Sequence, residues 1–371
     1  MAAFTCATVH GAMAEKGFDG TAVVLCEGAF ASTEGKTAHG LVRHTDRYRV
    51  QAVIDSGLAG RDAGEFLDGR PAGIPIVADL DQAIRAARGN PDYLVVGVAT
   101  HGGVLPGALR PAIRKALSLG IHVDSGLHEL LGDDPEFSAL AKARGARIRD
   151  VRRTPSREAM HPFTGGILEV TSVRLAVLGT DSGVGKRTTS VRLVQGLNAA
   201  GCSAALVGTG QTSWMQGVRY GLIMDSLVND FVSGEIEHQV LRAFREERPG
   251  AIVVEGQGCL THPAYPGGFE ILAGARPEAV VLQHAPARSH YDGFPDFPLA
   301  GVERETEVIR LLSGTPVVAI ALNHEGLKPD EMRLHADSLR ARHGIPCVDP
   351  LQDGVGPIIQ ELRRRFPRLP G

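Results

Sequence analysis

The sequence predicts an α/β protein with an N-terminal Rossmann-like parallel-sheet domain, followed by a P-loop NTPase-like three-layer α/β domain. Two observations carry this prediction. Short apolar runs rich in β-branched residues alternate with helical patterns along the chain, and this alternation is typical of parallel sheets covered by helices on both faces. One of these runs, at 173–178, leads into the glycine-rich segment Gly179–Lys186, and a helical pattern follows that segment.

The composition limits the classes of function. With 371 residues, of which 43% are hydrophobic, the chain is long enough for two domains with ordinary cores. A net charge of −3 and 5% aromatic residues give no reason to expect a nucleic-acid partner. No apolar run is long enough to span a bilayer, and residues 1–18 lack the features of a signal peptide. The five cysteines are scattered, which favours a reduced cytoplasm. We expect a cytoplasmic homo-oligomer that acts on a small molecule and not on a membrane.

The first part of the chain carries the expected strands and helices of a Rossmann-like domain. We expect strands at 21–26, 48–54, 74–77, 93–99, 121–124 and 146–151, with helices at 79–87, 109–119 and 135–144. No G-x-G-x-x-G motif follows the first strand, so we do not predict NAD binding. Gly35-Lys36-Thr37 superficially resembles a phosphate loop, but six residues separate Gly28 from Gly35, so we expect Lys36 and Thr37 to open a helix. We assign residues 1–151 to this domain.

Residues 152–170 contain proline, glycine and charge without a clear period, and we interpret them as a linker. The second domain is expected to occupy 171–371. Its further strands are predicted at 203–207, 251–255, 279–284, 317–323 and 346–349, with a helix at 330–343.

The glycine-rich segment predicts a phosphate-binding loop. Glycines let backbone N–H groups turn inward, the following helix N-terminus favours an anion, and a lysine adds a positive charge. The expected cofactor-binding residues run without a gap through the loop and the first helical turn: Gly179, Thr180, Asp181, Ser182, Gly183, Val184, Gly185, Lys186, Arg187, Thr188 and Thr189. The spacing is longer than G-x4-G-K-[ST] and has the form found in dethiobiotin synthetase and MinD-type proteins.

Arg187 departs from the usual pattern. In ATPases the residue after the lysine is a serine or threonine whose hydroxyl binds Mg²⁺, and an arginine cannot do this. Either Thr188 or Thr189 replaces that hydroxyl, or the loop holds phosphates without the usual metal, as a handle for coenzyme A or a nucleotide would require.

Two carboxylates are candidates for chemistry beside the loop. Glu255 ends an apolar strand, where an acid can bind Mg²⁺ or act as a base. Asp225 lies near the expected start of a helix at 223–231, where it either caps the helix or approaches the metal or the substrate amine. We therefore expect Glu255, Asp225 and Lys186 to be the catalytic residues. Asp181 and Glu255 would hold a metal only if the reaction depends on ATP and Mg²⁺.

Polar loop residues at the ends of strands are candidates for substrate binding, because ligands of α/β sheets bind at the carboxyl ends of strands. His101 precedes two glycines, and Asp124 and His128 are spaced to share a helix face, without the third ligand that zinc would need. Arg288 is suited to clamping a carboxylate or a phosphate. The full set of expected substrate-binding residues is His101, His128, Gln211, Thr212, Gln257, His262 and Arg288.

Several segments in order resemble one family, the P-loop proteins first catalogued as a domain of unknown function, some of which are D-glutamate N-acetyltransferases. The matching segments are GVATHGGVLP at 97–106, GIHVDSGLHELL at 120–131, DVR at 150–152, the loop at 179–189, GTGQT at 208–212, DSLVNDFVSG at 225–234, EGQGCLTHP at 255–263, QHAPAR at 283–288 and PCVDP at 346–350. The resemblance implies the two domains named above and transfer of acetyl from acetyl-CoA to the amine of a small acidic amino acid. The sequence departs from that branch at Gln283-His284-Ala285, where the resemblance implies Cys and Glu, and at Ser213-Trp214.

Three mechanisms remain open at this point. In the first, the loop holds the phosphates of acetyl-CoA, Glu255 or Asp225 takes a proton from the attacking amine, and Arg288 or His101 holds the substrate carboxylate. In the second, the protein is a ligase or kinase like dethiobiotin synthetase, with ATP and Mg²⁺ as cofactors. In the third, it is a nucleotide-switched partner protein of the MinD type.

Overall fold

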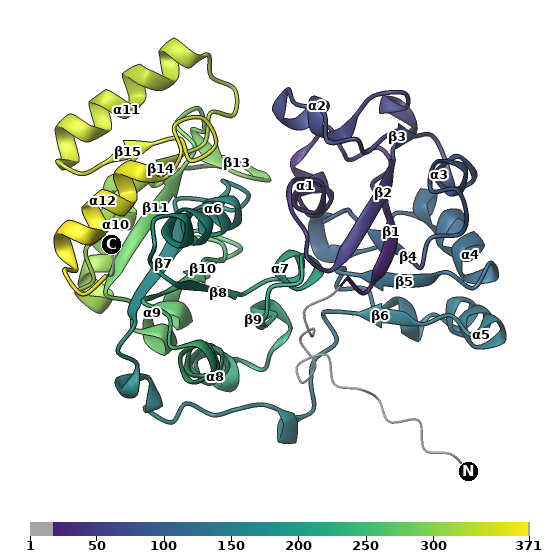
Figure 1. Ribbon diagram of the computed structural model, residues 1–371, viewed down its shortest axis with the longest axis horizontal. Coiled ribbons are helices and arrows are strands. Elements are labelled where there is room, and N and C mark those ends of the chain that lie inside the picture. The colour runs from purple at the N-terminus through teal and green to yellow at the C-terminus, as the bar shows by residue number, and fades with distance from the viewer. Residues whose placement is uncertain (1–17, 370–371) are drawn as a thin grey trace. The chain divides into compact units, whose positions relative to one another are not determined.

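The computed structural model describes residues 18–369, which form two compact units coloured from purple to yellow along the chain (Figure 1). The first unit contains the described residues up to Ala159 together with the separate segment Gly210–Arg219. The second contains Met160–Thr209 and the chain from Tyr220 onward. The prediction about a signal peptide concerns residues that lie almost entirely outside the described part. None of the described helices is long and apolar enough to cross a membrane.

The first unit is built on a six-stranded sheet in the order β3-β2-β1-β4-β5-β6, and its neighbouring strands pair in parallel. The strands are β1 (Gly20–Leu25), β2 (Tyr48–Ile54), β3 (Ile76–Val77), β4 (Tyr93–Val96), β5 (His122–Ser125) and β6 (Ile148–Asp150). This order confirms the Rossmann-like prediction. Strands β1 and β4 are apolar almost throughout because helices cover both faces of the sheet.

Five longer helices alternate with these strands: α1 (Lys36–Arg43), α2 (Ala63–Asp68), α3 (Leu80–Ala86), α4 (Arg110–Ser118) and α5 (Pro135–Arg144). Aspartates cap three of them, because the side chains of Asp62, Asp79 and Asp134 accept backbone N–H groups of the first turn. The segment at Lys36 opens α1 as predicted.

The short helix α7 (Gln211–Met215) belongs to the first unit, although its sequence neighbours lie in the second. The Thr212 hydroxyl lies 3.0 Å from the Thr37 hydroxyl, and Arg152 Nη2 donates to Gln211 Oε1 over 3.0 Å. A Cβ on Gly126 would lie 2.7 Å from Gln211 Cγ, so only glycine allows this close packing. Gln211 and Thr212, predicted to bind substrate from a loop, are therefore buried side chains that attach α7 to the first sheet.

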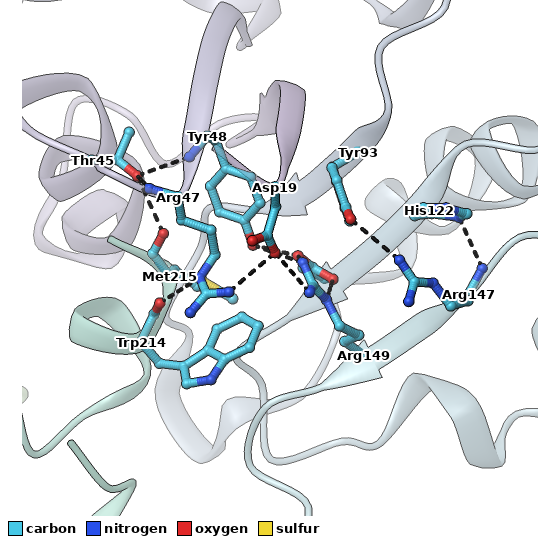
Figure 2. A network of polar contacts seen from close by, with 11 residues as sticks. Asp19, Thr45, Arg47, Tyr48, Tyr93, His122, Arg147, Arg149, Trp214 and Met215 are labelled. Atoms are coloured by element: carbon cyan, nitrogen blue, oxygen red, sulfur yellow. Dashed lines mark hydrogen bonds and ion pairs between the residues drawn. The ribbon is translucent and has the colours of Figure 1, made fainter. Parts of the chain in front are cut away.

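Trp214 is the only tryptophan of the chain and anchors α7 through two arginines (Figure 2). Arg47 Nε donates to the Trp214 carbonyl over 2.8 Å, and its guanidinium carbon lies 3.8 Å from the centre of the indole ring. The guanidinium carbon of Arg149 lies 5.0 Å from the same ring. Both distances are within the range of attractive cation–π contacts.

The two arginines are held by two aspartates of the same unit, of which Figure 2 labels Asp19. Asp124 is fully buried and accepts Arg149 Nε over 2.6 Å as well as the Tyr48 hydroxyl. Asp19 accepts Arg47 over 3.1 Å and Arg149 over 2.8 Å. Burial and the adjacent Asp124 carboxylate raise the pKa of Tyr48, so that its hydroxyl stays protonated and donates.

The second unit is built on a seven-stranded sheet in the order β15-β14-β11-β7-β10-β8-β9, again with parallel pairing. Its strands are β7 (Val173–Gly179), β8 (Ala204–Gly208), β9 (Tyr220–Gly221), β10 (Ala251–Glu255), β11 (Ala279–His284), β14 (Val317–Leu322) and β15 (Cys347–Val348). A separate two-stranded hairpin, β12 (His290–Tyr291) and β13 (Phe294–Pro298), follows β11 and was not predicted.

Helices cover both faces of this second sheet, which confirms the three-layer prediction (Figure 1). The helices are α6 (Lys186–Ala199), α8 (Asn229–Glu247), α9 (Phe269–Ala275), α10 (Gly301–Ser313), α11 (Pro329–His343) and α12 (Gly356–Arg365). Alternate residues of β7 enter different cores. Leu175 and Val177 pack with α6 and α12, whereas Ala176 and Leu178 pack with α8, α9, α10 and α11.

Replacing Asp124 with alanine should lower the free energy of unfolding by about 3 kcal/mol, because the partly exposed Arg149 loses its main carboxylate partner and the buried Tyr48 hydroxyl loses its acceptor. Denaturant unfolding followed by the fluorescence of Trp214 measures this directly. The matched control is Asp68→Ala, which removes the half-exposed partner of Arg43 and should cost about 1 kcal/mol or less. Equal effects of the two substitutions would show that the Asp124 network does not stabilise the unit.

Candidate active site

The predicted phosphate loop forms at the carboxyl end of β7 in the second unit. The strand ends at Gly179, and α6 begins at Lys186 with Gly185 as its N-cap. Gly183 and Gly185 have φ values of +62° and +108°, which side chains with a Cβ rarely adopt. These two glycines therefore shape the turn that places backbone N–H groups at the positive end of α6.

Lys186 lies over this loop. It is buried, and its Nζ donates to the Asp181 carbonyl over 2.6 Å. A Cβ on Gly256 would lie 2.3 Å from the Val177 carbonyl oxygen and 3.0 Å from Lys186 Cδ. Only a glycine at this position lets the end of β10 approach the lysine and the loop strand so closely.

Asp181 is fully buried and connects the loop to two other segments. Its Oδ1 accepts the Ser182 N–H over 2.7 Å, and its Oδ2 accepts the Asp292 N–H over 3.0 Å. Arg288 Nη1 also donates to Oδ2 over 2.9 Å, and His262 Nε2 lies 3.3 Å from Oδ1. Arg288 and His262, both predicted to bind substrate, therefore meet at the phosphate loop through the same carboxylate.

Both terminal nitrogens of Arg288 are engaged inside the protein. In addition to Asp181, Nη1 donates to the Ser182 carbonyl over 2.8 Å, and Nη2 donates to Glu325 over 2.8 Å. The arginine therefore joins the loop after β7 to the loop after β14.

Arg187, the departure from the usual pattern, faces the predicted acid. Its Nε lies 3.9 Å from Glu255 Oε1, and both side chains are mostly buried. Glu255 Oε2 also accepts the Thr209 N–H over 3.2 Å, and Gln257 Nε2 donates to the Thr209 hydroxyl over 3.2 Å. Burial lowers the pKa of Arg187, and the Glu255 carboxylate opposes that shift. The structure thus brings together Lys186, Arg187, Glu255 and Gln257 at adjoining strand ends.

Gln283 and His284, at the end of β11, belong to the loop site and were not among the predicted site residues. Gln283 Oε1 accepts the Thr189 hydroxyl, and its carbonyl accepts the Thr180 N–H over 3.0 Å. The Thr180 hydroxyl lies 2.9 Å from His284 Nδ1. Thr188 is partly exposed in the first turn of α6. The available signal in the sequence is the position of Gln283 and His284 at the end of an apolar strand, where ligands of α/β sheets bind.

The environment of His262 disfavours the protonated form of its ring. It is buried among aromatic rings, with centroids 4.9 Å from Tyr265, 4.9 Å from Tyr291 and 5.6 Å from Phe294. Burial lowers the pKa of His262, and the Asp181 carboxylate only partly offsets this.

Asp225 does not lie at the start of a helix, and that expectation was wrong. It sits in the short 3-10 turn Met224–Ser226, whereas α8 begins at Asn229 after Val228. The Met224 N–H donates to the Thr209 carbonyl over 3.0 Å. Asp225 is therefore an exposed carboxylate. Its turn lies beside Thr209, whose N–H donates to Glu255.

His101 and His128 belong to the first unit, whereas the phosphate loop belongs to the second. Both are exposed, and their loops are packed together, because the Glu129 N–H donates to the Gly103 carbonyl over 3.0 Å. Asp124 and His128 do not share a helix face, contrary to the expectation. Asp124 belongs to β5 and is buried, whereas His128 follows in a turn.

The free energy of unfolding should fall as the pH is lowered from the unfolded pKa of His284 to its folded pKa. Burial lowers its pKa from 6.5 to about 4. Between these values the unfolded chain binds a proton and the folded chain does not, so acid favours unfolding by at most about 3 kcal/mol. This loss begins below the unfolded pKa and is complete at the folded one.

Urea unfolding between pH 7.5 and 4.5 measures this dependence, and His284→Asn should make it shallower. The free energy of unfolding of this variant should still fall with falling pH, because burial also lowers the pKa of His262. Identical slopes for the variant and the unchanged protein would contradict the assignment to His284.

Comparison with known proteins agrees with this architecture. The P-loop domain model of a domain of unknown function, DUF1611, matches residues 161–359, and the matching Rossmann-like model DUF1611_N covers 56–154. Two relatives, from Tritonibacter scottomollicae and a Pseudoalteromonas species, are each named D-glutamate N-acetyltransferase and are 32% identical to this chain. The first match covers 72% of this chain and 80% of the relative, and the second covers 75% of this chain and 83% of the relative.

A crystal structure of a DUF1611 family protein from Anabaena variabilis superposes with a TM-score of 0.83 at 27% identity. The superposition covers 93% of this chain and 99% of that one. The chain therefore belongs to the DUF1611 family, with a Rossmann-like N-terminal domain and a P-loop C-terminal domain.

Proposed function

We propose that this protein is an N-acetyltransferase that moves acetyl from acetyl-CoA to the amine of D-glutamate or a related D-amino acid. The names of two relatives support the reaction class. The observation that carries the proposal is Arg187, which replaces the Mg²⁺-binding hydroxyl of ATPases and faces Glu255 at 3.9 Å. A loop that offers two adjacent cations and backbone N–H groups suits the phosphates of coenzyme A without a metal.

In this proposal the residues of the loop bind and orient the acyl donor. Lys186 and the N–H groups at the start of α6 contact phosphate oxygens, and Glu255 holds the Arg187 side chain in place. Arg288 keeps the loop in shape and does not hold the substrate carboxylate, because its guanidinium already contacts Asp181, Ser182 and Glu325. The substrate amine must lose a proton before it attacks, since only the neutral amine is a nucleophile.

A ligase or kinase that uses ATP and Mg²⁺ is the second candidate. Glu255 at the end of β10, beside the loop strand β7, supports it, because acids at this position bind Mg²⁺ in P-loop ATPases. Asp181, the other expected metal ligand, is poorly suited to bind Mg²⁺. Asp181 already accepts three hydrogen bonds and lies close to His262, which leaves little lone-pair capacity for a cation that needs oxygen ligands in octahedral geometry.

Lys186→Ala should weaken the binding of acetyl-CoA by at least about 10-fold, because it removes a charged donor to phosphate. Isothermal titration calorimetry without added metal measures the binding constant. Lys36→Ala is the matched control, since Lys36 follows a glycine and opens α1 in the first unit. The proposal fails if the protein binds ATP with Mg²⁺ but not acetyl-CoA.

Acetyl transfer from acetyl-CoA to D-glutamate should continue in EDTA at an unchanged rate, because the proposed site uses Arg187 in place of a metal. A thiol-reactive dye that detects released coenzyme A follows the reaction, with L-glutamate as the control for stereochemistry. Loss of activity in EDTA that Mg²⁺ restores would instead favour the ligase or kinase reading.

A further inference from the structure

A histidine and a buried aspartate meet at the carboxyl ends of two neighbouring strands, outside all the predicted sites. His324 follows β14, and Asp349 follows β15. These strands are adjacent in the second sheet (Figure 1). His324 Nδ1 is hydrogen-bonded to Asp349 Oδ2. Ligands of open α/β sheets bind at this edge, where loops follow the strands.

The aspartate of this pair is held from behind. Asp349 is 3% exposed, and its Oδ1 accepts the N–H groups of Leu351 at 2.8 Å and Gln352 at 3.3 Å. The Asp349 N–H in turn donates to Asp353 over 2.9 Å. A carboxylate fixed in this way selects the imidazole tautomer with its proton on Nδ1, which leaves Nε2 as the basic nitrogen.

The imidazole is partly open to solvent. The His324 side chain is 37% exposed, in contrast to its buried partner. Among residues 18–369, no hydrogen bond or ion pair of the protein engages Nε2. An oriented, partly exposed ring whose second nitrogen has no protein partner has the arrangement that general bases use in nucleophilic catalysis.

A chain of contacts connects this pair to the phosphate loop. Glu325, the next residue after His324, binds Arg288, and Arg288 binds the buried Asp181 of the loop. The loop after β14 is itself ordered, since the Leu327 N–H donates to the His324 carbonyl over 3.0 Å and the Glu325 N–H donates to Asn323 Oδ1 over 3.0 Å.

The separation between the His324–Asp349 pair and the phosphate loop also suits acetyl-CoA. Strand β14 is two positions from β7 in the sheet order β14-β11-β7, which corresponds to about 10 Å at ordinary strand spacing. The extended arm between the diphosphate and the thioester of acetyl-CoA is long enough to span this distance.

We propose that His324, oriented by Asp349, is the general base that accepts the proton of the substrate amine; this inference rests on the acetyltransferase function proposed above. The amine nitrogen attacks the thioester carbonyl carbon, a C–N bond forms, and the C–S bond breaks to release the thiolate of coenzyme A. His324 Nε2 takes a proton from the nitrogen and passes it to that thiolate, and the remaining ammonium proton goes to water. Glu255 is less suited to this role because it faces Arg187.

The test compares three variants in the acetyl-transfer assay. His324→Gln should lower kcat by about 100-fold or more, the usual contribution of a general base, with the binding of acetyl-CoA unchanged. It should also remove the contribution of this residue to the loss of kcat on the acidic side of the pH profile. Asp349→Asn should lower kcat by a smaller factor. Asp330→Asn, which changes an exposed carboxylate in the first turn of α11, should leave the acidic limb of the profile in place.

A further variant tests whether the His324–Asp349 pair acts in catalysis or only holds the loops after β14 and β15 together. Asp353→Ala removes the acceptor of the Asp349 N–H without altering the imidazole, and thermal unfolding reports the stability of each variant. Added imidazole should restore part of the activity of His324→Ala. The inference is overturned if His324→Gln keeps its rate and pH profile, or if Asp353→Ala is as inactive as His324→Gln, while the unchanged protein is active. An unchanged protein that transfers no acetyl group overturns the proposed function and the inference with it.

Discussion

The buried carboxylate of Asp181 is the contact on which the candidate site depends. A carboxylate with no exposure to water is costly unless cations and N–H groups surround it, and here Arg288, His262 and two backbone N–H groups do so. These groups come from three parts of the second unit's carboxyl edge: the phosphate loop itself, the segment after β11 and the loop after β10. Satisfying one buried charge therefore fixes the phosphate loop, the hairpin after β11 and the loop that contains His262 relative to one another.

The same principle explains the first unit, where the buried Asp124 and the partly exposed Asp19 hold two arginines against Trp214. The segment Gly210–Arg219 leaves the second sheet, packs on the first and returns, so the chain passes between the units three times. Gln211 and Thr212 serve this packing with their side chains. Polar residues in a glycine-rich stretch can thus serve packing as well as ligand binding, because a buried helix end needs the same hydrogen-bonding groups; the binding of substrate by Gln211 and Thr212 stays a prediction.

Much of the fold was predictable because its determinants are local. Strands β2 and β11 and helix α5 begin and end where the apolar pattern and the capping residues placed them, and the phosphate loop follows from glycine conformation and the adjoining helix. The hairpin β12–β13 was missed because its strands are short and mostly exposed, so they lack an apolar period. The turn at Asp225 was mistaken for a helix start because an aspartate before an apolar run fits both structures.

The two α/β domains, the strand–loop–helix that presents Lys186, and the position of Glu255 at a strand end can be predicted from the sequence. These features depend on residues close together in the chain. The contacts of Arg187 with Glu255, of Asp181 with Arg288 and of His324 with Asp349 are visible only in the folded protein. Those pairs join residues from separate strands, and the order of strands in a sheet, which sets which loops become neighbours, is a property of the whole folded chain.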